Sequence, residues 1–393
     1  MGTITIEGPD GTNQILNIEA LGSKFAHLSD QRFARGIRYS LPVLLVLILL
    51  ARLAGETTPY GISQWLNYRS KQLATIFNLK SGRTPSTNTI RRTLSDTILV
   101  SELQQVTIQF LHEAYGNRKG DQIVIDGKTM RGTIPKGQTK GVHLLSAFMP
   151  QEEIVLDQIE VATKENEISA APRLLSKLGL KGKFVSGDAM FTQRDLSVEI
   201  GASGGDYLWF VKENQLTLLQ DVEQFFVPPR KKAGWYIPEP DLAEAESLNV
   251  GHGRIEKRRI QVAQDETGFI DWPNLKQVFK IERTVTHVAK NKTTYEVAFG
   301  ITSLDSDQQS ASQLLDSIRS HWGIENKLHY RRDVTLKEDD VRMSCSKQAE
   351  AVAVINNFIV CLSKRLGFDS LAEAIRCFAA QIDLNLAILS FCT

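Results

Sequence analysis

The stretch Asp121-Gln-Ile-Val-Ile-Asp126 marks the point at which the chain changes from a helical to a β-rich pattern. Its central Ile-Val-Ile residues are apolar and β-branched, which favours a strand that is buried on both faces. Gly127 follows Asp126 directly and ends the apolar run. The sequence therefore predicts a buried strand that carries a carboxylate, Asp126, at its end.

The residues after this stretch predict alternating strands and helices. Apolar runs bounded by Gly, Pro and polar residues are typical of strands, and apolar residues at steps of three and four indicate helices. We expect strands at 142–149, 153–161, 182–188 and 207–211, and helices at 168–178, 196–200 and 216–227. Three strands followed by helix, strand, helix and strand is the element order of a ribonuclease-H-like α/β domain.

The pattern beyond these elements is β-rich again and then helical. We interpret residues 228–304 as a β-rich insertion, with strand candidates at 255–262, 277–288 and 293–304. A long helix is predicted over 311–330, and the chain from Ser346 onward is helical and apolar. The expected catalytic domain is therefore residues 116–393, an α/β core interrupted by a β insertion.

The region before this domain predicts helices. Residues 1–20 indicate a loosely ordered tail, and residues 21–115 carry apolar residues at helical spacing. Ser86 or Thr87 can cap a short helix that contains two adjacent arginines. This all-helical N-terminal domain fits either a DNA-binding helix-turn-helix or a plain bundle with a basic solvated face.

The composition is that of an ordinary globular protein. Lys and Arg number 46 against 45 Asp and Glu, so net charge does not indicate a nucleic-acid partner and local clusters must do so. The cysteines Cys345, Cys361, Cys377 and Cys392 show no zinc-binding spacing and suit a reducing compartment. The apolar stretch 41–51 is too short to span a membrane as a helix, and no secretory signal opens the chain. We expect a cytoplasmic protein that does not bind membranes.

Three acidic residues lie where metal-dependent phosphodiester chemistry would need them. Asp126 and Asp188 each follow a predicted strand, and Glu325 lies on a helix face that mixes Trp322 and Leu328 with polar residues. Two-metal cleavage needs carboxylates that converge from different elements, and Mg²⁺ prefers oxygen ligands. Ordinary alternatives stay open, because the aspartates could form turns or cap helices and Glu325 could join an internal ion-pair network.

Four segments of the chain resemble the H-repeat-associated (ISAs-type) insertion-sequence transposases. They are Ile125-Asp-Gly-Lys-Thr-Met-Arg-Gly-Thr133, Gly187-Asp-Ala-Met-Phe-Thr-Gln193, His321-Trp-Gly-Ile-Glu-Asn-Lys-Leu-His329 and Asp333-Val-Thr-Leu-Lys-Glu-Asp-Asp340. The resemblance covers nearly the whole chain, and the segments occur in the right order. It implies a DDE transposase with a ribonuclease-H-like core, in which Asp126, Asp188 and Glu325 would be the first, second and third acidic ligands.

The resemblance also implies a cofactor and partners. The enzyme would use two Mg²⁺ ions, with Mn²⁺ as a substitute, to cleave transposon ends and join them to target DNA. Double-stranded DNA would be the partner and a homodimer the working form. Basic and polar side chains near the carboxylates are candidates for phosphate contacts. These candidates are Lys128, Arg131, Lys212, Asn214, His252, Arg254, His321, Asn326, His329 and Arg332.

Some positions depart from related families, and other functions stay open. A related signature places Tyr, Arg, Glu and Lys on the last helix, where this chain has Ile318, His321, Glu325 and Arg332. A metal-dependent nuclease of the same fold would cut DNA without joining it, and an inactive or domesticated derivative would only bind DNA. A zinc site of His321, Glu325 and His329 is disfavoured, because helix positions i, i+4 and i+8 span about 12 Å.

Overall fold

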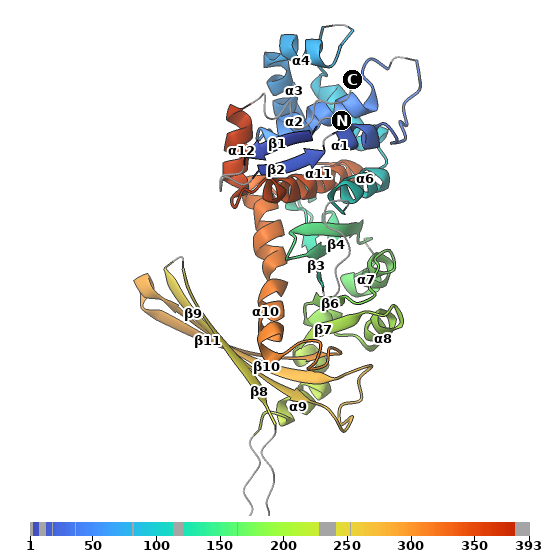
Figure 1. The fold of residues 1–393 in the computed structure, drawn as a ribbon. Coiled ribbons are helices and arrows are strands. Elements are labelled where there is room, and N and C mark those ends of the chain that lie inside the picture. Colours follow the sequence, from blue (N-terminus) through green and yellow to red (C-terminus); the bar gives the residue numbers. More distant parts are fainter. Residues whose placement is uncertain are drawn as a thin grey trace, which may run out of the picture.

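A nine-stranded sheet runs through the molecule in the order β5-β4-β3-β6-β7-β11-β10-β9-β8 (Figure 1). The computed structural model describes residues 3–7, 13–17, 19–35, 37–80, 82–112, 121–162, 164–227, 241–251 and 253–381. The strands of this sheet are β3 (Gln122–Thr129), β4 (His143–Met149), β5 (Ile154–Glu160), β6 (Phe184–Gly187), β7 (Asp206–Val211), β8 (Ala243–Gly251), β9 (Arg254–Gln264), β10 (Gln277–His287) and β11 (Lys292–Thr302). The chain therefore has a mixed α/β fold built on one large sheet.

The central strands are buried on both faces, as their apolar sequences predict. In β3, Ile123, Val124 and Ile125 are fully buried. Strands β3, β6 and β7 are parallel to one another, whereas β3, β4 and β5 form an antiparallel meander. Trp209 of β7 bonds to the helix α8 and the next residue, Phe210, packs on the end of α10. Because successive strand residues point to opposite faces, these helices cover opposite faces of the sheet.

The helices of this region connect or flank the central strands. They are α7 (Glu167–Leu175), α8 (Arg194–Ala202), α9 (Leu216–Gln224) and α10 (Ala311–His321). Short 3₁₀ turns occur at η2 (Arg131–Thr133), η3 (Ala189–Phe191), η4 (Glu213–Gln215) and η5 (Val288–Lys290). The predicted helices at 168–178, 196–200 and 216–227 are confirmed with shifted ends.

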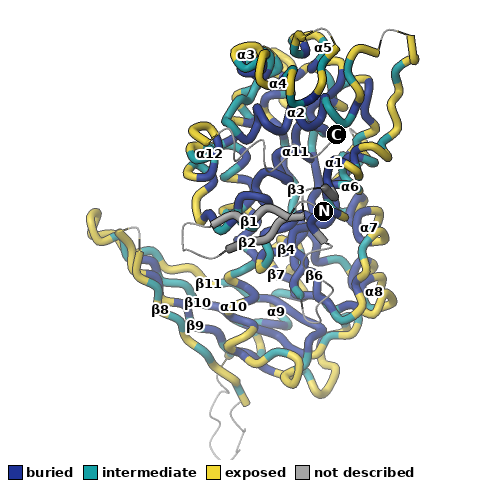
Figure 2. The backbone as a smooth tube through the Cα atoms, turned by 45° about the horizontal axis from the view of Figure 1, so that its top comes forward, coloured by how far each residue is buried: buried dark blue, intermediate teal, exposed yellow. Residues whose placement is uncertain are grey.

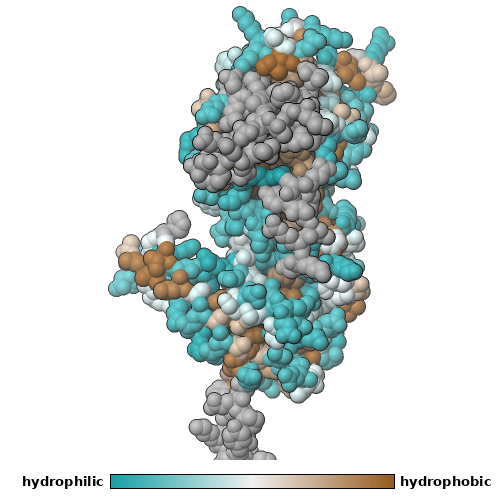
Figure 3. All heavy atoms as spheres, in the orientation of Figure 1, coloured by the Kyte–Doolittle hydropathy of each residue, from teal (hydrophilic) through white to brown (hydrophobic). Residues whose placement is uncertain are grey.

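The predicted β insertion extends the central sheet. Strand β11 pairs with β7 from Phe299↔Val211 to Thr302↔Leu208, and β10, β9 and β8 follow in antiparallel order. The outer strands form an arm that projects from the body and is largely exposed (Figures 1 and 2). Exposed apolar side chains gather toward the tip of this arm, as Figure 3 shows. They are Leu248, Val250, Ile255, Val288 and Tyr295.

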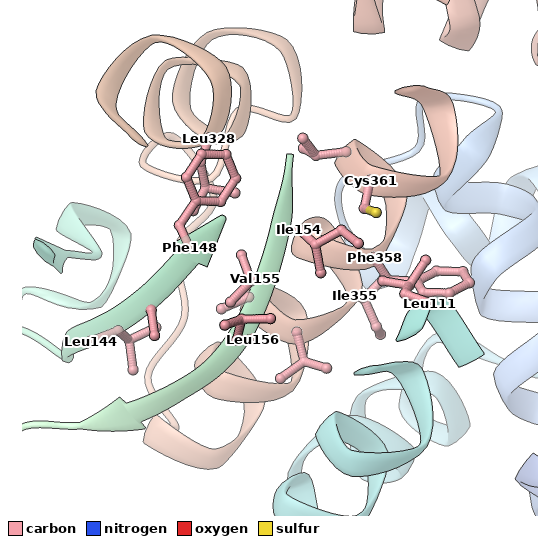
Figure 4. Close-up of a cluster of buried hydrophobic side chains, with 14 of the residues drawn as sticks. Leu111, Leu144, Phe148, Ile154, Val155, Leu156, Leu328, Ile355, Phe358 and Cys361 are labelled. Atoms are coloured by element: carbon pink, nitrogen blue, oxygen red, sulfur yellow. The ribbon is translucent and has the colours of Figure 1, made fainter. Parts of the chain in front are cut away.

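Helices from both ends of the chain pack together at one end of the sheet (Figure 1). They are α1 (Glu19–Phe25), α2 (Leu41–Leu53), α3 (Pro59–Tyr68), α4 (Ser70–Ile76), α5 (Thr87–Arg92), α6 (Val100–His112), α11 (Ser346–Arg365) and α12 (Leu371–Ala380), with a π-helical turn η1 (Thr93–Thr97). Figure 4 shows Leu111 of α6 next to Phe358 of α11, and both residues line a small cavity together with Val155 of β5. The N-terminal helices therefore share one apolar core with the C-terminal helices and the sheet.

Several smaller expectations can be compared with the structure. Helix α2 is buried along most of its length, and none of the described helices is long and apolar enough to cross a membrane. Ser86 caps α5, while the helix-turn-helix interpretation stays a prediction. The N-terminal tail contains a hairpin of β1 (Thr3–Glu7) and β2 (Asn13–Asn17), in place of the loosely ordered segment that we expected. Three of the cysteines are free, and Cys392 lies outside the described residues.

Candidate active site

Asp126 and Asp188 lie at the same level on two neighbouring parallel strands. In the register of β3 and β6, Ile125 pairs with Gly187, and each aspartate is the next residue along the chain. Neighbouring strands are about 4.8 Å apart, so the two side chains leave adjacent points of the backbone. Asp126 is mostly buried, with 25% of its side chain exposed, whereas Asp188 is 61% exposed at the start of η3. The structure thus brings the first two predicted acidic residues together.

Glu325 lies on an interrupted helix. The predicted helix 311–330 ends as α10 at His321, and two π-helical segments follow, η6 (Ile324–His329) and η7 (Arg331–Thr335). The helix predicted over 311–330 is therefore confirmed, but its second half is π-helical. Gly323 has a low helix propensity and stands at the break, and π-helical turns are frequent at functional sites. Segment η6 contacts β3, and Leu328 packs near Phe148 of β4 (Figure 4). Glu325 itself is exposed.

The acid–base behaviour of Asp126 shows that several carboxylates surround it. Burial, together with the smaller effects of the negative charges of Glu167, Asp188 and Glu325, raises the pKa of the Asp126 carboxyl to about 7. A backbone hydrogen bond at Gly127 opposes this rise in pKa. Mutual repulsion of this kind is relieved when a cation binds among the carboxylates.

His321 is held against Asp188 by a chain of buried hydrogen bonds. Gln122 Nε2 donates to Ser186 Oγ at 2.8 Å and to the Ser317 carbonyl at 3.0 Å. Ser186 Oγ lies 3.2 Å from His321 Nδ1, which leaves His321 Nε2 facing Asp188 Oδ1 at 4.0 Å. The His321 side chain holds the pKa of Asp188 below its ordinary value. This chain fixes α10 against β3 and β6 and holds His321 close to the Asp188 carboxylate.

His329 lies on the other side of the site, beside Asp126. Its Nδ1 is 3.4 Å from Asp126 Oδ2, and its Nε2 has no hydrogen-bond partner among the described residues. Burial, together with the positive charges of Arg332 and Lys128, lowers the pKa of His329 to about 3. The imidazole is therefore neutral at neutral pH, and the contact with Asp126 is not an ion pair. Both histidines are buried, so their predicted DNA contacts would need a strand that reaches into the site.

Two residues that we expected to contact DNA are buried in an ion-pair network. Lys128 is 7% exposed, and its Nζ lies 2.7 Å from Asp333 Oδ1 and 3.1 Å from Asp339 Oδ1. Arg332 is fully buried and bonded to Glu338, with an N–O distance of 2.7 Å. The prediction of DNA contact was wrong for both residues, because their charge is already neutralised inside the protein.

The other predicted DNA contacts are more accessible. Arg131, Lys212, Arg254 and Asn326 are exposed. The side chain of Asn214 donates a hydrogen bond to the Ala189 carbonyl, so one of its functions is to hold the turn after Asp188. His252 lies outside the described residues. The contacts of the exposed residues with DNA stay a prediction.

The sequence interpretation missed Glu167 and its partner His143, which lie near Asp126. Glu167 begins α7, and its Oε1 lies 2.8 Å from His143 Nε2. In the sequence, Glu167 follows the helix cap Asn166, and an acidic residue in the first turn of a helix is ordinary. No local pattern therefore distinguished Glu167 from a residue that only stabilises the helix.

The donor atoms of the site fit a hard divalent cation. Within the described residues, no three His, Cys, Asp or Glu side chains are grouped so that they could hold an ion by themselves. Mg²⁺ commonly binds to one or two carboxylates, with water and substrate phosphate oxygens as the remaining ligands. Asp126 and Asp188 provide such a carboxylate pair, and the charge of Glu325 is near Asp126. These residues therefore fit Mg²⁺ together with a phosphodiester.

Comparisons with known proteins match both the N-terminal helical region and the region of the large sheet to transposase families. Residues 23–111 match the family described as "DDE_Tnp_1-associated", and residues 117–362 match the "Transposase DDE domain". The chain is 30% identical over 352 residues to "Putative protein YbfL" and to "H repeat-associated putative transposase YhhI", both of Escherichia coli (strain K12). Each alignment covers 88% of this chain and 90% of the relative.

A solved structure is also similar at a low level. It is a piggyBac transposase synaptic complex with hairpin DNA, with a TM-score of 0.41 and 10% identity over 94% of this chain and 77% of that one. The two family matches meet in the segment between α6 and β3.

Proposed function

The chain belongs to the DDE transposase family, in its H-repeat-associated group, and on this basis we propose that it cleaves transposon ends and joins them to target DNA with divalent metal ions. Asp126, Asp188 and Glu325 would bind the metal. The observation that carries this proposal is the register of β3 and β6, which places Asp126 and Asp188 side by side. The charge of Glu325 near Asp126 adds to it. The parallel order of β3, β6 and β7 beside an antiparallel meander supports a ribonuclease-H-like core.

The protein side chains in this mechanism bind and orient the reactants. Asp126 and Asp188 offer carboxylate oxygens from two neighbouring strands, and the buried His321 faces Asp188 at 4.0 Å. Neutral His329 places no positive charge beside Asp126, so the Asp126 carboxylate stays available to a cation. When bound, Mg²⁺ ions supply the positive charge that activates the attacking hydroxyl and stabilises the leaving oxygen.

Double-stranded DNA is the proposed partner, and two surfaces could bind its phosphates. Arg131 lies in the turn after β3, and Lys212 follows β7. The other surface is next to the arginines between the arm and α10. Arg258 and Arg283 already pair with Glu256 there, so the exposed Arg319 is the residue of this group that would contact a phosphate.

The remaining parts of the proposal concern assembly and place. We propose that residues 21–115 assist in DNA binding, that the working form is a homodimer and that it acts in the cytoplasm on chromosomal DNA. The family match of residues 23–111 supports the first point, because this type of region accompanies the DDE domain.

Substitution of the three acidic residues tests the proposal. The variants Asp126→Asn, Asp188→Asn and Glu325→Gln should lose Mg²⁺-dependent cleavage of a duplex that carries the transposon end, while their DNA affinity in EDTA is kept. Glu199→Gln, which changes an exposed carboxylate on α8, is the matched control and should keep full activity. Full cleavage by any of the three variants would remove that residue from the site. Cleavage by the wild-type protein without joining to target DNA would favour the nuclease alternative.

A further inference from the structure

The turn between β4 and β5, residues 150–153, packs against the helical segment that carries Glu325. Glu153 ends this turn, and its carboxylate pairs with Lys327 of η6 and Arg331 of η7. We propose that Glu153 is a positioning residue, which holds Glu325 in place by tying η6 and η7 to the sheet. This inference rests on the proposed function and deepens it, because it names the residue that sets the position of the third acidic ligand.

Each oxygen of the Glu153 carboxylate holds one basic side chain. Lys327 Nζ lies 3.2 Å from Oε1, and Arg331 Nη1 lies 2.6 Å from Oε2. Lys327 Nζ also donates a hydrogen bond to the Pro150 carbonyl at 3.0 Å, so the main chain of the turn shares this contact. The Glu153 side chain is only 5% exposed, and charge-assisted bonds that are shielded from water hold their geometry better than exposed ones. The turn is therefore bonded to both π-helical segments.

The backbone of Glu153 indicates that the side-chain contacts, and not the shape of the turn, require a glutamate here. Its φ of 56° lies in the left-handed region, which glycine and asparagine adopt more readily than other residues. Among the described residues, three of the other four non-glycine residues with positive φ are asparagines. Residues held in this conformation against their preference are concentrated at functional sites. A glycine at position 153 would suit the turn but would lose both ion pairs.

Glu325 depends on the backbone of η6 for its position. Within the described residues, no hydrogen bond or ion pair holds its carboxylate, which is exposed. The regular helix α10 ends at His321, so it does not by itself fix the segment that follows. Leu328 packs beside Phe148 near the end of β4 (Figure 4), but an apolar contact has no preferred direction. The bonds to Glu153 are directional, and they hold the segment directly after Glu325.

Hydrogen exchange of the full-length protein in EDTA, without DNA, tests whether Glu153 holds this segment. Glu153→Gln keeps the length and shape of the side chain but removes its charge. We expect the amides of residues 324–331 to exchange roughly 10-fold faster in this variant, because the segment opens more often when its ion pairs are lost. The amides of β3 should exchange at the wild-type rate. Unchanged exchange of residues 324–331 would overturn the proposal.

Metal binding tests whether this contact positions Glu325. We expect Glu325→Gln to raise the Kd for Mn²⁺, measured by electron paramagnetic resonance, about 10-fold, and Glu153→Gln to raise it about 3-fold. The double variant should bind Mn²⁺ as weakly as Glu325→Gln alone, because Glu153 acts through Glu325. A glutamate with only a structural role would lower the melting temperature and leave the Kd for Mn²⁺ unchanged. All values are compared at a temperature at which circular dichroism shows every variant to be folded.

Lys327→Met separates lost positioning from a changed electrostatic field. Glu153→Gln removes a negative charge, which could weaken cation binding without any movement of Glu325. Lys327→Met removes a positive charge, which by itself would strengthen Mn²⁺ binding. Weaker Mn²⁺ binding by both variants therefore supports positioning, and stronger binding by Lys327→Met overturns it. The Lys327 side chain is 41% exposed, so this variant also serves if Glu153→Gln does not fold.

Glu165→Gln is the matched control. Glu165 forms a pair of similar length, 2.9 Å, with Arg173 beside α7. Its loss should change neither the exchange of residues 324–331 nor the Kd for Mn²⁺. An equal effect of Glu165→Gln would show that any lost ion pair loosens the protein, which would contradict a specific role of Glu153.

Asp126→Asn distinguishes a failure of this inference from a failure of the proposed function. If Asp126→Asn and Glu325→Gln raise the Kd for Mn²⁺ and Glu153→Gln does not, the metal site stands and the role of Glu153 is wrong. If neither Asp126→Asn nor Glu325→Gln changes Mn²⁺ binding, the proposed metal site is refuted, and the positioning role of Glu153 is overturned with it.

Discussion

The buried pair of Arg332 and Glu338 allows a prediction whose size follows from the structure. Both side chains are fully buried, and two guanidinium nitrogens of Arg332 bond to the Glu338 carboxylate at 2.7 to 3.1 Å. Replacing Arg332 by Met leaves Glu338 with the Asn356 amide at 2.7 Å and Lys128 at 3.5 Å. The variant thus retains a buried carboxylate that has lost its main partner.

The expected loss of stability follows from the burial of the pair. Breaking one side of a buried ion pair costs about 3–5 kcal/mol. Burial alone would raise the pKa of Glu338, but Arg332, Lys128 and Asn356 outweigh burial and lower the pKa from 4.5 to about 2. Because Lys128 and Asn356 remain, we expect Arg332→Met to lower the free energy of unfolding by about 3 kcal/mol, at the lower end of that range.

Urea unfolding followed by circular dichroism measures this loss of stability. A parallel measurement of DNA affinity shows whether Arg332 has a structural role or contacts DNA. The double variant Arg332→Met, Glu338→Leu should be more stable than the sum of the two single variants predicts, since no charge is left unpaired. Arg259→Met is the control, because Arg259 pairs with Glu244 at a similar 2.8 Å but both side chains are 40% exposed. We expect a much smaller loss for this control, because solvent screens the exposed pair.

The result that would refute this reasoning is a stable Arg332→Met protein with altered DNA binding. If Arg332 contacted phosphates as the sequence interpretation held, its loss would reduce the salt dependence of DNA affinity by roughly one phosphate contact. An unchanged urea midpoint together with such a reduction would show that Arg332 reaches DNA.

Three further predictions concern acid stability, the sheet and the site. The pKa of Glu338 is about 2 in the folded protein, so its contribution to stability is present above about pH 4.5 and is lost as the pH falls toward 2. Urea midpoints at a series of pH values should show this loss, and the midpoints of Glu338→Gln should depend less on pH. Gly300→Ala would place a Cβ 2.1 Å from a ring carbon of Phe279 where β11 joins β7, so we expect a loss of about 1–3 kcal/mol in thermal unfolding, and no such loss for Gly251→Ala, whose Cβ meets nothing within 4 Å. Ser186→Ala removes a hydrogen bond of His321 and should slow cleavage by roughly 10- to 100-fold with DNA affinity unchanged; an equal fall in both would contradict a role in orientation.

The strands of the core could be predicted because burial is visible in their composition. Apolar and β-branched runs identified β3, β6 and β7, and the acidic residues Asp126 and Asp188 followed from them. The expected end of the first strand at Asp126 was wrong, because β3 continues through Gly127 to Thr129 in its pairing with β4. Strand β8 was missed. Its residues Ala-Glu-Ala-Glu-Ser-Leu-Asn-Val-Gly are mostly exposed at the edge of the sheet, so no buried face leaves an apolar alternation in the sequence.

The roles of the charged side chains were harder to predict, because sequence shows charge and not burial. Lys128 and Arg332 are basic residues beside predicted acidic ligands, which favoured DNA contact, yet the partners that bury them include Glu338, Asn356 and Asn357 from elements that the topology brings near. The π-helical segment around Glu325 was equally hidden, since its residues suit an ordinary helix and only the packing on β3 and β4 selects the wider turn. The position of Glu167 was hidden for the same reason, because it follows from packing of α7 against Gly127 of β3, which is distant in the sequence.

The joining of β11 to β7 has a mechanical consequence. From β5 at one edge to β8 at the other, every neighbouring pair of strands is hydrogen-bonded. Among the described strands, no unpaired segment separates the arm from β3, which carries Asp126. A load applied at the tip of the arm would pass through these backbone hydrogen bonds toward β6 and β3. The arm and the two aspartates are therefore attached to one continuous sheet.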